Sequence, residues 1–129
     1  MAGISNLGDF LAGLEDEKAE IGKAYAAETK SAGKAVLETA VSITPVLTGV
    51  HRGSWVVGIG SEPGGSGNEP DPSGAQTLAQ GLAVIEGAQA GQDIIILNDG
   101  PAIEELDLGR SNQAPAGISD AAIAAGERG

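Results

Sequence analysis

The sequence is poor in cysteine, aromatic and basic residues, and each shortage limits what the chain can form or bind. There is no cysteine among the 129 residues, which excludes disulfides, thiolate metal sites and thiol catalysis. Aromatic residues make up 2% of the chain, so a core must be built from the smaller Ala, Val, Ile and Leu. Seven basic residues stand against eighteen acidic ones, and the net charge of -11 argues against direct binding to DNA phosphates.

Long apolar runs are also absent. The most strongly apolar stretch is Ile94–Leu97, whereas a membrane-spanning helix needs about 20 apolar residues. The first 30 residues lack the basic start and apolar run of a secretory signal peptide. We therefore expect a protein that is made in the cytoplasm and does not enter a membrane.

What the sequence does contain suits one domain covering residues 1–129, since single domains commonly have about 100–150 residues. A hydrophobic content of 41% is sufficient for a core. The 21 glycines raise the entropy cost of folding, so we expect neighbouring subunits to add stability.

The N-terminal third has the pattern of a long amphipathic helix. Apolar residues recur at helical spacing from Ile4 to about Val41, and acids and lysines occupy the other face. An uninterrupted helix over 9–42 would be roughly 50 Å long, too long for so small a domain to cover. We expect part of its apolar stripe to pack on a neighbouring subunit. A break or bend is possible at its glycines, which are Gly8, Gly13, Gly22 and Gly33.

Pro45 ends this helix, because the residue before a proline avoids the helical conformation. The patterns that follow predict a strand at 55–59, a helix at 77–90, a continuously apolar and therefore central strand at 93–97, a turn at 98–101, a short helix at 101–106 and an Ala-rich helix at 118–125. The expected fold is α+β: a long N-terminal helix packed on a small, mainly antiparallel sheet, with one or two further helices.

A long Gly/Pro-rich loop separates the first strand from the second helix. Residues 60–74 contain almost nothing apolar, and loops longer than about 12–15 residues are usually functional or disordered. Two interpretations remain open: the loop is disordered filler, or it reaches a neighbouring ring or protein. On the second interpretation the candidate interface residues are Ser61, Glu62, Asn68, Glu69 and Asp71, together with Arg110.

The candidates for chemistry are weak. His51 is the only histidine, and a lone histidine without cysteine is a poor metal site. Glu104, Glu105 and Asp107 follow Pro101, where the dipole of a short helix explains acidic residues. The glycines around Ile59 lack the rest of a dinucleotide fingerprint, and those at 64–67 lack the Lys-Ser or Lys-Thr of a phosphate-binding loop. We expect no catalytic residue, cofactor or metal.

Several residues nevertheless have a clear structural role. Thr48 and Gly49 can form a turn that sends the chain back along the first helix. Arg52 lies three residues before Trp55, the largest apolar group, and can pair with an acid such as Glu105 or Asp107. Further along the chain, Gly109 and Pro115 restrict the shape of a loop.

Two stretches resemble a known family. Residues 44–55, TPVLTGVHRGSW, resemble the signature T-P-V-D-T-G-x-L-R-x-S-W of the tail-component family of long-tailed bacteriophages. Residues 98–117, NDGPAIEELDLGRSNQAPAG, resemble its segment N-x-x-P-Y-A-x-x-L-E-x-G-x-S-x-Q-A-P-x-G. The residues that carry the resemblance are Thr44, Pro45, Thr48, Gly49, Arg52, Ser54, Trp55, Asn98, Pro101, Asp107, Gly109 and Pro115. The chain departs from the signature at Leu47, His51 and Ala102, and Asp107 replaces a glutamate.

The resemblance implies a structural protein of the virion. Such a protein caps the end of the tail tube and joins it to the head connector or stopper protein, as a ring of about six copies. The long helix and the 60–74 loop would supply ring contacts, and an acidic inner surface would let genome DNA pass without specific binding. A head-closure or tail-terminator subunit of the same neck is the alternative. Less favoured is a small cytoplasmic acid/base enzyme, which would need a pocket lined by acids.

Overall fold

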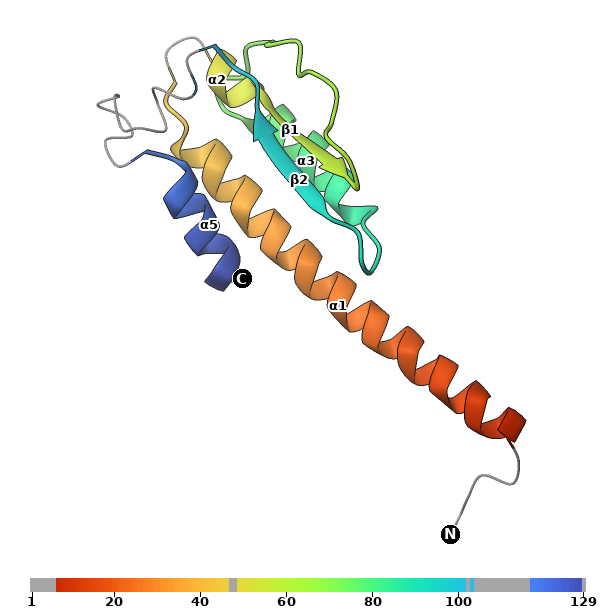
Figure 1. Cartoon of the computed structure of the whole chain (residues 1–129). Helices are drawn as coiled ribbons and strands as arrows, with labels where there is room; N and C mark the ends of the chain where they lie inside the picture. Colours follow the sequence, from red (N-terminus) through yellow and green to blue (C-terminus); the bar gives the residue numbers. More distant parts are fainter. Residues whose placement is uncertain (1–6, 47–48, 102, 104–116, 129) are drawn as a thin grey trace.

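The computed structural model describes residues 7–46, 49–101, 103 and 117–128, and it has the expected α+β fold (Figure 1). Its most prominent element is helix α1 (Leu7–Ile43), whose 37 residues correspond to about 55 Å. The possible break at the glycines does not occur. The C-terminal half of α1 packs on the rest of the fold, and the N-terminal half projects away from it (Figure 1).

The sheet has two antiparallel strands, β1 (Trp55–Ile59) and β2 (Ile94–Asn98), with Trp55 opposite Asn98 and Ile59 opposite Ile94. Both strands were predicted, but the central position of β2 was wrong, because β1 is its only strand neighbour among the described residues. The apolar run of β2 therefore has a cause other than a central position in the sheet. Alternate side chains point to opposite faces, and those of Ile94 and Ile96 pack against the core.

The main core lies between α1, the sheet and helix α3 (Ala75–Glu86), which packs on both. Its buried members include Leu37 from α1, Ile85 from α3 and Val57 from β1. Gly81 permits this packing, because a Cβ atom there would lie 2.4 Å from Cδ2 of Leu37. Helix α3 corresponds to the helix predicted at 77–90, and it begins and ends earlier than predicted.

A second cluster forms on another side of α1, where helix α5 (Ser119–Arg128) lies along it (Figure 1). Ala40 of α1 packs there against Ile118 and Ala122. The expected Ala-rich helix at 118–125 is confirmed, shifted by one residue at its start and three at its end.

A tight corner joins α1 to β1. It contains the short helix α2 (Val50–Gly53), which the sequence patterns did not predict. Gly49 precedes it with a φ of +85°, and a Cβ atom there would lie 2.6 Å from the backbone nitrogen of Pro72. Residues 60–74 then cross this region without helix or strand, as expected for a loop.

Candidate functional site

The described residues of the two signature stretches converge where α1 ends. Thr44, Arg52, Ser54, Trp55 and Asn98 lie on different elements, yet hydrogen bonds link each of them to a neighbour from this region. We call this set the motif corner. The sequence placed these residues in two separate segments, and the antiparallel pairing of Trp55 with Asn98 brings the segments together.

Arg52 caps the C-terminal end of α1. Its Nε donates to the carbonyl oxygen of Thr44 at 2.8 Å, and its Nη2 donates to that of Ser42 at 2.9 Å. Its Nη1 donates to the carbonyl oxygen of Pro72 at 3.1 Å, which ties the loop to the same side chain. The last turn of α1 has no basic residue of its own, so Arg52 supplies the positive charge that a helix C-terminus favours. Among the described residues the partners of Arg52 are thus backbone carbonyls, whereas Glu105 and Asp107, the acids expected to pair with it, lie outside the described residues.

Thr44 and Trp55 form the inner part of the motif corner. The Thr44 side chain is fully buried, and its hydroxyl donates to the carbonyl oxygen of Ala40 in the last turn of α1. The indole Nε1 of Trp55 donates to the same hydroxyl at 2.9 Å. The Trp55 ring packs against both core clusters. One side chain therefore joins the end of α1, the start of β1 and both halves of the core.

Two further contacts close the motif corner. The hydroxyl of the fully buried Ser54 lies 2.6 Å from the carbonyl oxygen of Val50 and 2.8 Å from Oδ1 of Asn68. Nδ2 of Asn98 donates to the carbonyl oxygen of His51 at 2.8 Å, which fixes the end of β2 to α2. The His51 ring in turn contacts the carbonyl oxygen of Pro101 through Nε2.

The 60–74 loop is attached to the fold by its polar side chains. The Asp71 carboxylate accepts from the backbone N–H of Thr77 at 2.8 Å and from its hydroxyl at 2.7 Å, so it caps the first turn of α3. The backbone hydrogen bond from Thr77 is the main cause that lowers the pKa of Asp71. The Asp99 carboxylate similarly accepts from the hydroxyl and backbone N–H of Ser66, and the hydroxyl bond is the main cause of its lowered pKa.

These contacts divide the candidate interface residues. Asn68 and Asp71 form hydrogen bonds within the subunit, although Asn68 is exposed, and Ser61, Glu62 and Glu69 are exposed as well. Sequence reasoning missed the capping role of Asp71, although an acid shortly before a predicted helix is a known signal for it. The remaining candidates lie outside the described residues: Thr48, Asp107, Gly109, Arg110 and Pro115, as do Glu104 and Glu105.

The motif corner has the properties of a structural joint. Within the part of the chain that the structure describes, no buried side-chain nitrogen or oxygen lacks a hydrogen-bond partner. The described residues also include no group of three acids or histidines able to hold a metal ion. The polar side chains here hold backbone segments together.

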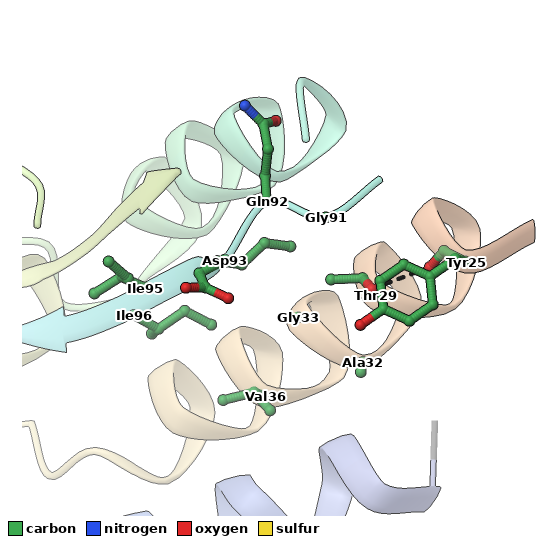
Figure 2. A pocket seen from close by; sticks show the side chains of 11 residues that line it. Tyr25, Thr29, Ala32, Gly33, Val36, Gly91, Gln92, Asp93, Ile95 and Ile96 are labelled. Atoms are coloured by element: carbon green, nitrogen blue, oxygen red, sulfur yellow. Dashed lines mark hydrogen bonds between the residues drawn. The ribbon is translucent and has the colours of Figure 1, made fainter. Parts of the chain in front are cut away.

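An open groove of about 700 Å³ lies beside the middle of α1. Figure 2 shows its lining: Tyr25, Thr29, Ala32, Gly33 and Val36 come from α1, and residues 91–96 form the other side. The Thr29 hydroxyl donates to the carbonyl oxygen of Tyr25 at 3.0 Å. Asp93 supplies the one carboxylate among the lining residues.

The third feature is the projecting half of α1. Its large apolar side chains are exposed: Leu7 at 69%, Phe10 at 42%, Leu11 at 50%, Leu14 at 45%, Ile21 at 68% and Tyr25 at 58%. They lie at helical spacing on one side of α1, and the stripe expected from the sequence is therefore present and uncovered within the described part of the subunit. A contiguous exposed apolar surface of this kind is typical of an interaction site.

Comparison with known proteins gives no relative: the chain matches no protein-family model, no curated protein and no solved structure. Among the described helices, none combines the length and apolar character that crossing a membrane requires.

Proposed function

We propose that this chain is a structural protein of the neck of a long-tailed bacteriophage, where a ring of copies caps the tail tube and joins it to the head connector. The observation that carries the proposal is the motif corner. The signature residues resemble those of phage tail components, and the described ones form one joint that fixes the direction of α1 against the sheet. The joint explains physically why the signature residues occur together, and this explanation requires no catalysis.

The projecting half of α1 supports an assembly role. Within the described residues this apolar stripe is exposed to water, so we expect another molecule to cover it. Ring proteins use such surfaces for contacts between copies or with the next ring. The exposed Ser61, Glu62 and Glu69 offer a second, polar surface for contact with tail tube or connector proteins.

The acidic composition fits passage of DNA through the ring. With eighteen acidic and seven basic residues, the subunit repels phosphate instead of binding it. On this proposal the chain acts in the virion and needs no cofactor.

Electron microscopy of lysates from a phage or prophage that lacks this gene tests the proposal. Full heads beside free tails of normal length would support joining or completion, and tails of abnormal length would favour a terminator subunit. Ordinary infectious particles would refute a neck function. Complementation with Arg52→Ala and with Gln76→Ala, an exposed position on α3, provides a matched pair, in which the first variant restores fewer joined particles than the second.

A further inference from the structure

The projecting half of α1 has the spacing of a coiled coil. Its exposed side chains follow each other at steps of four, three, four, three and four residues, which is the heptad pattern of positions that face a second helix. We call these six residues the α1 seam: Leu7, Leu11, Leu14, Lys18, Ile21 and Tyr25. Five of them are apolar and between 45% and 69% exposed. The seam covers 19 residues, or about 28 Å of helix.

The same face of α1 is already used by a helix further along. Beyond Tyr25 the face continues through Ala32 and Val36, where α5 packs so closely that a Cβ atom at Gly126 would lie 2.5 Å from Cγ2 of Val36. The seam begins where this intramolecular cover is absent among the described residues. Because a helix covers this face further along α1, we expect the molecule that covers the seam to present a helix with an apolar face as well.

We propose that the partner is the α1 seam of a second copy, running antiparallel. In this orientation the seam closes on itself, because Leu7 faces Tyr25, Leu11 faces Ile21 and Leu14 faces Lys18 of the second copy. Every position of the seam then has a counterpart, with the level of Asp16 at the twofold axis. A contact of this isologous kind uses one surface twice and forms a closed pair.

The charges favour the antiparallel orientation. A parallel pair in register would place the two Lys18 ammonium groups opposite each other inside the seam, which is unfavourable. The antiparallel pair moves each Lys18 beside Leu14 of the other copy. There it lies near the carboxylates of Glu15 and Glu17, and the two Lys18 ammonium groups offset the two Glu17 carboxylates that this orientation brings close together at the axis. Lys18 thus selects both the orientation and the register, as single polar residues in coiled-coil seams do.

This inference rests on α1 alone and is independent of the proposed neck function. The pair describes the free protein, because a ring would have to share or release the same seam. The chain has no native cysteine, so single introduced cysteines report which residues face each other. Both the oligomeric state and the orientation can therefore be measured on the full chain.

The experiment compares disulfide formation in four variants under mild oxidation. Glu17→Cys, beside the seam at the twofold axis, should form a linked dimer readily. Asp16→Cys is the matched control, because residue 16 points away from the seam and should link at least tenfold more slowly. Leu7→Cys alone should stay unlinked, but should link when mixed with Tyr25→Cys. Linkage of Leu7→Cys to itself, or equal linkage at residues 16 and 17, would overturn the proposal.

Light scattering provides the second measurement. The unmodified chain should have a concentration-dependent mass that rises to twice that of the monomer, and Leu11→Glu, which would place a charge opposite Ile21, should remain monomeric. Leu11 is exposed in the subunit, so this substitution should leave the thermal unfolding of the core unchanged. A monomeric unmodified chain at every concentration, or a larger oligomer without the Glu17→Cys linkage, would overturn the antiparallel pair.

Discussion

The indole nitrogen of Trp55 donates a hydrogen bond to the hydroxyl of Thr44 across 2.9 Å, and that hydroxyl itself donates to the last turn of α1. Two residues eleven positions apart thereby connect the end of a helix to the start of a strand. The Thr44 side chain is fully buried, so its hydroxyl cannot replace its partner with water.

The coupling between these two residues can be measured with a double-mutant cycle. Trp55→Phe removes the N–H and keeps a ring, whereas Thr44→Val removes the hydroxyl and leaves the indole N–H unpaired. Each should lower the free energy of unfolding by about 1–3 kcal/mol. The double variant should lose about 1 kcal/mol less than the sum, because both changes remove one shared bond. Urea unfolding followed by circular dichroism gives these values, and strict additivity would show that the bond contributes nothing.

Arg52 should be sensitive to a conservative replacement. Its guanidinium donates to three carbonyl groups, those of Ser42, Thr44 and Pro72, and a lysine ammonium cannot reach them with the same fork geometry. Arg52→Lys should therefore lower the free energy of unfolding by about 1–3 kcal/mol despite the unchanged charge. The matched control is Lys18→Ala on the projecting half of α1, for which the change should stay within about 0.5 kcal/mol at monomeric concentrations. An equally stable Arg52→Lys variant would mean that charge alone matters there.

Gly49 and Gly60 allow backbone strain to be separated from steric clash. Both have positive φ angles, +85° and +77°, but a Cβ atom meets Pro72 only at Gly49. Gly60→Ala should cost about 1–2 kcal/mol, the strain of a left-handed conformation. Gly49→Ala should cost about 1–3 kcal/mol more, because the loop must also move. Thermal or urea unfolding of the two variants tests the difference, and equal costs would contradict the close approach of residues 49 and 72.

Asp71 should contribute to stability in a pH-dependent way. Its pKa is lowered from the ordinary value of 3.8, chiefly by the backbone hydrogen bond from Thr77. A carboxyl whose folded pKa lies below its unfolded pKa stabilises the fold above the unfolded value, and the contribution is lost as the pH falls through the folded pKa. Stability should therefore fall below about pH 4 in the unmodified chain.

The variant Asp71→Asn isolates this contribution. It should be less stable than the unmodified chain at pH 7 and should lose less stability on acidification. Thr77→Val is the companion control, since it removes the hydroxyl bond and retains the backbone N–H. Urea unfolding between pH 7 and pH 3 provides the measurement. Parallel pH profiles for the unmodified chain and Asp71→Asn would contradict the capping role.

The regular elements of the fold were predictable because each has a repeated local signal. The spacing of apolar residues indicated α1, and the run around Ile95 indicated β2. The position of β2 in the sheet was not predictable from that run, because half-burial on both faces of a two-stranded sheet produces the same apolar pattern as a central strand. Helix α2 was missed because four residues are too few for a periodic signal.

The contents of the motif corner were predictable only in part. The sequence singled out Arg52 and Trp55, but it could not identify backbone carbonyls as the partners of Arg52, because every residue carries one. Asn68 and Asp71 were interpreted as surface residues, since their location in a polar loop hides the fact that they face Ser54 and Thr77. Which residues of a loop turn inward depends on its folded path.

The unbroken course of α1 has a mechanical consequence. Leu37 and Val41 anchor one end in the core, and the other end stands free of it (Figure 1). A straight helix without a hinge acts as a lever, so a small tilt at the anchored end becomes a displacement several times larger at the tip. The bonds of Arg52 to Ser42 and Thr44 lie at the pivot of this lever. A molecule that binds the tip of α1 can therefore exert a force on the motif corner about 50 Å away.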